Sequence, residues 1–189
     1  YQTPMCDLKS DGTFTEPVKK GFSTDHFAQS AIDFLDKQTP NKPFVTYVAF
    51  TAPHDPRSPL PDYLKRYGTV PLPPNFMPAH PFNFGSDMTV RDEMLAAYPR
   101  TTDVIKSQLT EYYAMITHLD EAIGKILAKL KEKGLDKNTI VVFAADNGLA
   151  MGSHGLLGKQ NLYEHSMRVP LIVSGVGIPK NQKRDAFVY

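Results

Sequence analysis

The sequence predicts an α/β domain with a mostly parallel sheet flanked by helices. Two apolar runs, residues 43–50 and 139–145, have the composition of buried strands. Between them, apolar residues recur at steps of three and four from about residue 101 to 133, which is typical of an amphipathic helix. A strand, a helix and a strand in that order usually form a right-handed parallel crossover.

Length and composition are those of one globular domain. The chain has 189 residues, 41% of them hydrophobic and 22% charged, which argues against overall disorder. Its net charge of +1 gives no electrostatic case for nucleic acid or an anionic membrane, and no apolar run is long enough to span a bilayer. The single cysteine, Cys6, excludes an intrachain disulfide and forms no metal-site pattern.

The first fifty residues predict a loop, a helix and a strand in turn. Residues 1–22 lack periodicity and are expected to be irregular, with a hairpin near Asp11-Gly12. Ser23 or Thr24 is expected to cap a helix that ends by residue 39, and residues 43–50 follow as a buried strand.

Residues 53–100 predict a long irregular segment that is nevertheless ordered. Nine of the sixteen prolines lie between Pro53 and Pro81, together with aromatic residues that a free linker would not carry. Long ordered loops tend to cover or shape functional sites, so this segment is expected to shape the site. His80 within it has no partner at a meaningful spacing.

The second half of the chain predicts a long helix followed by two strands. Thr101 or Thr102 is expected to begin the helix, and Gly134 is well placed to cap its end. His118 is expected to be a satisfied helix residue rather than a ligand. Residues 139–145 and 169–174 follow as strands. The predicted apolar stripe of the helix comprises Ile105, Leu109, Tyr112, Ile116, Leu119, Ile123, Ile126 and Leu130.

The strand at residues 139–145 ends in a polar pair, Asp146 and Asn147. A carboxylate beside an amide carbonyl offers the oxygen ligands that Ca²⁺ or Mg²⁺ prefers. An ordinary turn at Asn147-Gly148 explains the same residues slightly better when they are taken alone. Two ligands are also too few for a calcium site, so further ligands would have to come from elsewhere.

A glycine-punctuated loop follows and carries Lys159. Glycines allow close backbone approach, so Lys159 could neutralise an anionic substrate oxygen, although lysines are most often solvated surface residues. Glu164 and Arg168 are expected to form a helical ion pair.

Two histidines are further candidates for the site. His54 follows the other predicted strand, and the carboxyl ends of parallel strands share one edge, so it could converge with Asp146 and donate a proton to a leaving group. His154 lies in the glycine-rich loop. Histidines in loops often have no catalytic or binding role.

Four stretches taken in this order resemble the sulfatase family, within the alkaline-phosphatase-like superfamily. They are PFVTYVAFTAPHDP, YYAMITHLDEAIGKIL, NTIVVFAADNG and GSHGLLGKQNLYEHSMRVPLIVSGVGIP. The resemblance implies a calcium-dependent sulfuric ester hydrolase that acts on a sulfated small molecule or glycan.

Position by position, the resemblance also implies roles for individual residues. Asp146 and Asn147 match one pair of metal ligands in the family. Lys159 matches the lysine that binds the sulfate, and His54 matches a histidine that contacts the sulfate and can protonate the leaving group. His154 falls near the substrate in similar enzymes.

The chain departs from the family at the nucleophile. That group is a formylglycine made from the first residue of a C/S-x-P-x-R motif, but Cys6 is followed by Asp7-Leu8-Lys9 and no serine supplies the motif. The early acidic pair of metal ligands that the family carries is also absent, and the chain starts at Tyr1 without an initiator methionine. We therefore expect an incomplete catalytic domain with half a metal site, inactive alone. Family habit suggests a periplasmic, secreted or lysosomal setting.

Two other functions remain open from the sequence. One is a phosphodiesterase or phosphonate hydrolase of the same superfamily, although many such relatives place a histidine after the aspartate, where this chain has Asn147. The other is a non-catalytic anion-binding module.

Overall fold

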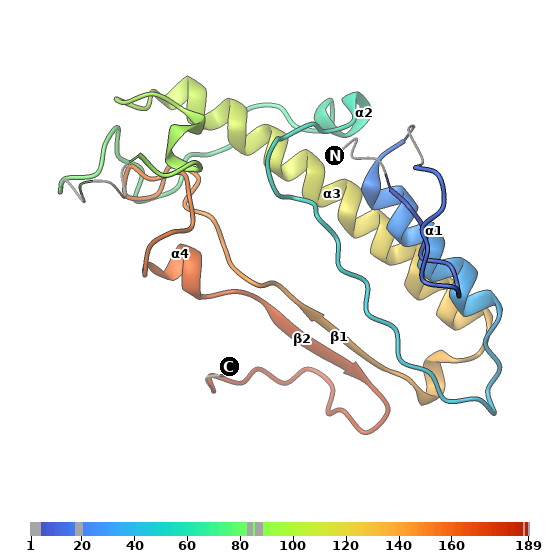
Figure 1. The fold of residues 1–189 in the computed structure, drawn as a ribbon. Coiled ribbons are helices and arrows are strands. Elements are labelled where there is room, and N and C mark those ends of the chain that lie inside the picture. The colour runs from blue at the N-terminus through green and yellow to red at the C-terminus, as the bar shows by residue number, and fades with distance from the viewer. Residues whose placement is uncertain (1–4, 18–20, 83–84, 86–88, 187, 189) are drawn as a thin grey trace.

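The computed structural model describes residues 5–17, 21–82, 85, 89–186 and 188 of the chain. Figure 1 shows helix α1 (Ser23–Asp36) lying along the long helix α3 (Thr102–Glu132). The two strands lie on the other side of the extended segment at residues 43–50. Helices and strands together confirm the predicted α/β class. The elements in chain order are α1 (Ser23–Asp36), α2 (Pro61–Leu64), the 3₁₀ turn η2 (Glu93–Leu95), α3 (Thr102–Glu132), the 3₁₀ turn η3 (Asp136–Asn138), β1 (Ile140–Ala144), α4 (Glu164–Met167) and β2 (Leu171–Gly175).

Both predicted caps of α3 are confirmed. The Thr101 hydroxyl accepts a hydrogen bond from the main-chain N–H of Val104 at 3.3 Å, which satisfies one of the free donors of the first turn. At the other end Gly134 adopts a φ of 67°, and the N–H of Leu135 returns to the carbonyl of Leu130 at 3.0 Å. This Schellman geometry stops the helix where the glycine stands.

Helix α1 begins differently from the prediction. Its N-cap is Phe22, which makes no side-chain cap bond, whereas Ser23 and Thr24 are buried within the first turn. The Ser23 hydroxyl lies 3.0 Å from that of Thr51, so it ties the helix to the neighbouring loop instead of capping it. Predicting Ser23 or Thr24 as the cap was therefore wrong.

The middle of α3 is buried through a mixture of small and larger side chains. Its buried side chains there are Ala114, Met115, His118 and Ala122, whereas Ile116 of the predicted stripe is 38% exposed. His118 Nε2 lies 2.9 Å from Asp25 Oδ1, the aspartate in the first turn of α1. The prediction that His118 is a satisfied helix residue is confirmed.

The two strands pair antiparallel, whereas the sequence predicts a mostly parallel sheet. Strand β1 pairs antiparallel with β2, from Ile140 opposite Gly175 to Ala144 opposite Leu171. Residues 145–170 connect the two strands through loops and the four-residue helix α4, and β2 returns alongside β1 in the opposite direction. Among the described residues, this antiparallel pair makes up the whole sheet.

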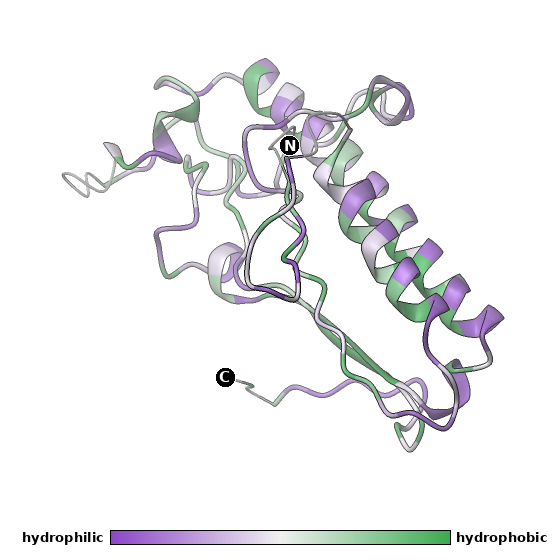
Figure 2. Ribbon diagram, turned by 45° about the vertical axis from the view of Figure 1, so that its right-hand side comes forward, coloured by the Kyte–Doolittle hydropathy of each residue, from purple (hydrophilic) through white to green (hydrophobic). Residues whose placement is uncertain are grey.

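The strands are also more exposed than their composition predicts. Ile140 is 52% and Val142 61% exposed, although residues of this kind were expected to be covered on both faces. Figure 2 shows both strands coloured as hydrophobic. The described part of the chain does not cover these apolar side chains.

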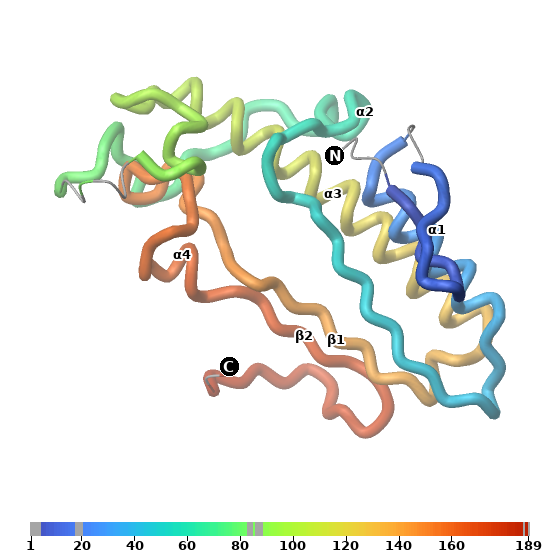
Figure 3. The backbone as a smooth tube through the Cα atoms, in the orientation of Figure 1, coloured from blue at the N-terminus to red at the C-terminus, as the bar shows by residue number. Residues whose placement is uncertain are grey.

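Residues 43–50 run extended but do not form the predicted strand. No backbone ladder joins them to another segment among the described residues, and Val45 and Tyr47 are 93% and 90% exposed. Figure 3 shows this segment running in the same direction as β1. Phe44 and Val141 contact one buried cluster, which joins the segment, β1 and the helix pair; its members are Leu35, Leu130 and Leu135.

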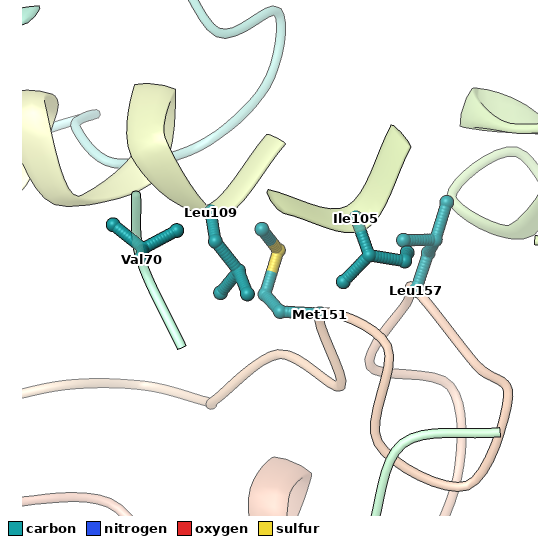
Figure 4. Packing of buried hydrophobic residues seen from close by; sticks show 5 residues of the cluster. All are labelled: Val70, Ile105, Leu109, Met151 and Leu157. Atoms are coloured by element: carbon teal, nitrogen blue, oxygen red, sulfur yellow. The ribbon is translucent and has the colours of Figure 1, made fainter. Parts of the chain in front are cut away.

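A second buried cluster fastens the glycine-rich loop to α3. Ile105 and Leu109 project from the helix, Met151 and Leu157 come from the loop, and Val70 comes from the proline-rich segment (Figure 4). Ile105 and Leu157 are fully buried, and burial of such a side chain is worth about 1.5–3 kcal/mol. The loop that carries the candidate site residues is thus anchored by apolar contacts at both ends.

Candidate active site

Asp146 and Asn147 lie directly after β1, where the strand gives way to a loop. The N–H of Asn147 donates to Asp146 Oδ1 at 2.9 Å, and the Asn147 side-chain nitrogen donates to the carbonyl of Gly148 at 2.9 Å. These local bonds agree with the turn interpretation of the pair. They also use the amide nitrogen of Asn147, so its oxygen remains suited to a cation.

The glycine-rich loop at residues 148–158 is folded tightly against the proline-rich segment. Gly152 and Gly155 have φ values of 99° and 72°, and His154 between them also has a positive φ, of 55°. A Cβ on Gly155 would lie 2.3 Å from the carbonyl carbon of Ala79, so only glycine fits there. The backbone at this point is fixed by close approach.

A buried ion pair holds this loop in place. Arg100 Nη2 donates to Glu93 Oε2 at 2.7 Å, and the two residues are only 1% and 4% exposed. Glu93 Oε1 accepts the main-chain N–H groups of Gly158 at 2.7 Å and Leu157 at 3.1 Å, and Arg100 donates to the carbonyl of Gly155. One carboxylate therefore satisfies both a buried cation and two buried amides.

Lys159 follows this loop and is partly buried. Its N–H donates to the side-chain oxygen of Gln160 at 3.2 Å, and Gln160 donates to Asp92 Oδ2 at 2.9 Å. Burial alone would raise the pKa of Asp92, but bonds from Gln160 and Arg91 and the positive charges of Arg91 and Lys159 lower it below its usual range. Asp92 is thus a buried anion beside Lys159.

His54 reaches the same group of charges from the other side. Its Nδ1 lies 2.7 Å from the carbonyl oxygen of Asp55, and its Nε2 lies 3.4 Å from Arg91 Nη2. Arg91 in turn donates from Nε to Asp92 Oδ1 at 2.7 Å. His54, Arg91, Asp92 and Gln160 therefore form a continuous series of contacts that brings His54 to the segment of Lys159.

His154 belongs to an aromatic cluster. Its ring stacks on Tyr163 with centroids 4.2 Å apart, and its Nε2 lies 3.0 Å from the side-chain nitrogen of Asn75. His80, left without a partner by the sequence, lies 2.8 Å from the Tyr163 hydroxyl. Burial and then the charge of His154 lower the pKa of His165, whose ring also lies beside Tyr163. The cluster joins the proline-rich segment to α4.

A cavity of about 430 Å³ lies between the charged contacts that end at Gln160 and the aromatic cluster around Tyr163. Gln160, the neighbour of Lys159, forms part of its wall, and so does Tyr163, on which His154 stacks. The cavity therefore has a size typical of small-molecule sites. Its lining residues are Val90, Glu93, Leu156, Gln160, Asn161, Leu162 and Tyr163.

The contacts of Asp146 and Asn147 do not extend to these groups. Among the described residues no set of three or more His, Cys, Asp or Glu side chains is placed to hold a metal ion. The pair offers hard oxygen donors of the kind that Ca²⁺ takes, but Ca²⁺ needs six to eight of them. The donors fit a calcium ion in kind and fall short in number.

Sequence reasoning missed four residues that organise the site: Arg91, Asp92, Glu93 and Arg100. The first three form a run of charged residues inside a segment otherwise rich in proline and apolar side chains, and that run is the signal that could have found them. Charges in an ordered apolar segment need partners, because burying them unpaired is costly. The predicted ion pair of Glu164 with Arg168, by contrast, is confirmed at 3.7 Å.

The sequence model of the Sulfatase family matches residues 2–189. The chain belongs to the sulfatase family. Membership confirms the resemblance carried by the four sequence stretches. Membership of this family generally implies a bound metal ion and a formylglycine.

Two curated sulfatases illustrate the relationship. An arylsulfatase of Clostridium perfringens is 32% identical over 165 residues, which cover 87% of this chain and 34% of that protein. The N-acetylglucosamine-6-sulfatase of Homo sapiens is 30% identical over 173 residues, which cover 88% of this chain and 30% of that protein. This sulfatase chain therefore spans about a third of the length of these relatives.

A solved structure shows the same fold. The phosphonate monoester hydrolase of Agrobacterium radiobacter superposes with a TM-score of 0.62 at 23% identity, covering 80% of this chain and 32% of that chain. A sulfatase homologue of Bacteroides fragilis also superposes, with a TM-score of 0.64 at 29% identity, covering 87% of this chain and 33% of that chain. The fold is thus alkaline-phosphatase-like, as the resemblance implied. In the described part of the chain, no helix is both long and apolar enough to cross a membrane.

Proposed function

We propose that this chain contributes part of the active site of a sulfuric ester hydrolase. The observation that carries the proposal is the series of contacts that joins His54 to Lys159 through Arg91, Asp92 and Gln160. The series links the side chain of His54 to the main chain of Lys159, 105 positions further along the chain, in a member of the sulfatase family.

In this proposal Lys159 binds a sulfate oxygen as a compact positive charge. Sulfate ester cleavage moves negative charge from the sulfuryl group onto the leaving oxygen, and fixed positive charge stabilises that change. Buried Asp92 and the clamped loop hold the lysine segment in place, so little reorganisation is needed when the anion arrives. Among the proposed site residues of this chain, Lys159 is therefore the one whose removal should lower kcat the most.

His54 is proposed as the acid that protonates the leaving oxygen. Nδ1 lies against the Asp55 carbonyl, and a proton on Nδ1 would be held there by a 2.7 Å bond. Nε2 then faces the Arg91 side of the site and, once protonated, can transfer its proton to the departing group. His154, fixed by Tyr163 and Asn75, is proposed to contact the organic part of the substrate.

Asp146 and Asn147 are proposed as two ligands of a Ca²⁺ ion. When bound, such an ion would offset the negative charge of the sulfuryl oxygens. Further ligands, and the nucleophile that family resemblance makes a formylglycine, would come from protein outside these 189 residues. The chain alone is therefore expected to be inactive.

The substrate is proposed to be a sulfated small molecule or a sulfated glycan. The relatives named above act, by their names, on aryl sulfates and on 6-sulfated N-acetylglucosamine. The cavity beside Gln160 and Tyr163 is large enough for a single ring of either kind. By the same family resemblance, the protein is proposed to work in a periplasmic, secreted or lysosomal setting.

There are two alternative functions: one is hydrolysis of a different ester, and the other involves no catalysis. The likeness to a phosphonate monoester hydrolase favours, as second candidate, hydrolysis of a phosphonate or phosphate diester on the same scaffold. A non-catalytic anion-binding module would keep His54 and Lys159 and lack a nucleophile throughout the protein.

The test is turnover of a chromogenic aryl sulfate by the intact protein that contains this chain. Lys159→Ala should lower kcat by roughly a hundredfold to a thousandfold, the usual cost of removing one group that stabilises the transition state. Lys183→Ala is the matched control, because that side chain is 82% exposed and should leave turnover unchanged. Equal turnover by wild type and Lys159→Ala, with both folded, would remove Lys159 from the site.

A further inference from the structure

The side chain of Arg91 lies beside His54, one of the residues of the proposed anion site. Its Nη2 is 3.4 Å from His54 Nε2 and 3.5 Å from Asp55 Oδ1. The side chain is still 60% exposed, so solvent and small ions reach it. Arg91 is thus accessible and placed beside the nitrogen proposed to serve the leaving group.

Asp92 fixes the direction of this guanidinium. Arg91 donates to Asp92 Oδ1 from Nε at 2.7 Å and also from Nη2, while Gln160 occupies Asp92 Oδ2 at 2.9 Å. Asp92 is only 1% exposed, so it cannot swing out into solvent with its partner. A planar guanidinium held along one edge by a buried carboxylate loses little further entropy when it binds an oxyanion.

Positive side chains face both carboxylates beside the site. Arg91 lies against Asp55 and Asp92, and Arg57 interacts electrostatically with the same two carboxylates. Lys159 adds positive charge near Asp92. Removal of the Arg91 charge would leave two carboxylates near the place where a sulfate has to bind. The arrangement therefore needs Arg91 for attraction and also to screen those carboxylates.

We propose that Arg91 is a third cationic residue of the anion site, binding a sulfate oxygen beside His54, and that Asp92 is its positioning residue. The proposal rests on the proposed function, because it takes His54 and Lys159 as the other two sides of the site. The ligand chemistry is a tetrahedral oxyanion or its ester. In this arrangement the Arg91 guanidinium and the Lys159 ammonium group both bind the anion, together with the His54 imidazole.

The test is a titration of this chain with inorganic sulfate, followed by NMR signals of His54 and Lys159. We expect binding in the roughly millimolar range, as for a single small anion in a partial site. Arg91→Gln should weaken binding roughly tenfold or more, the scale of one charge-assisted hydrogen bond. Arg91→Lys, which keeps the charge and loses the edge-on pairing with Asp92, should fall between the two.

Arg168→Gln is the matched control, because Arg168 is also paired with a carboxylate but is 73% exposed on α4. Unshifted Leu157 and Gly158 amides would show that each variant keeps the folded loop. If sulfate moves the His54 and Lys159 signals but Arg91→Gln binds as tightly as wild type, the inference fails and the proposed function stands. If sulfate moves neither signal in the wild type, the proposed function fails and the inference with it.

Discussion

Replacement of Glu93 by alanine should be among the most damaging single changes to this fold. The substitution leaves Arg100 fully buried without its carboxylate partner and leaves two buried main-chain N–H groups, those of Leu157 and Gly158, without an acceptor. Removing one member of a buried ion pair costs about 3–5 kcal/mol. Since small domains have about 5–15 kcal/mol of stability in total, the variant should sit near its unfolding midpoint in mild denaturant.

The assay is urea unfolding of the chain followed by far-ultraviolet circular dichroism. Glu93→Gln keeps one acceptor oxygen and should lose less of the free energy of unfolding. Its stability can therefore still be measured if the alanine variant does not fold. Glu164→Ala is the control, because its pair with Arg168 is exposed and such pairs contribute about 0–1 kcal/mol.

A double-mutant cycle between Glu93 and Arg100 should give a coupling of about 1–3 kcal/mol. The reasoning is refuted if Glu93→Ala is no more destabilising than Glu164→Ala. It is also refuted if the effects of the Glu93 and Arg100 substitutions on the free energy of unfolding are additive.

Two further predictions follow from the same site. Because the pKa of Asp92 is lowered in the folded chain, its ionised form stabilises the fold above the unfolded pKa, and that stability is lost as the pH falls through the folded pKa. Urea midpoints should therefore fall more steeply below about pH 5 for wild type than for Asp92→Asn; parallel pH profiles would contradict this. Calorimetric titration of the chain with Ca²⁺ should show binding no tighter than about 1 mM, because Asp146 and Asn147 supply only two ligands. Micromolar affinity would mean that the calcium site is more complete than these two residues.

The sequence predicted best what is encoded locally. Thr101 and Gly134 mark the ends of α3 because a cap depends on a few neighbouring residues. The hairpin at Asp11-Gly12 is likewise present, with Leu8 paired to Phe14. Such features need no knowledge of distant segments.

The strand arrangement could not be predicted in the same way. An apolar run such as residues 43–50 signals a buried strand, but pairing requires a neighbour at hydrogen-bonding distance. No described strand lies there, so its backbone stays extended and Val45 and Tyr47 remain exposed. The direction of β2 also depends on how the chain returns through α4, which composition does not specify.

The site was predictable only in part for a related reason. His54, His154 and Lys159 could be chosen because the residues around them resemble a family. The family resemblance does not single out Glu93 and Arg100. Their structural role comes from hydrogen bonds to a buried loop more than fifty positions away. Partnerships of that kind depend on tertiary packing, which a single sequence does not reveal.

The measurement that tests the central claim most directly is turnover by the intact protein containing this chain, with an aryl sulfate and an aryl phosphonate monoester compared side by side. The account predicts a higher kcat/KM for the sulfate ester and its loss in Lys159→Ala. A preference for the phosphonate, or no turnover of either ester by folded protein that holds Ca²⁺, would contradict it.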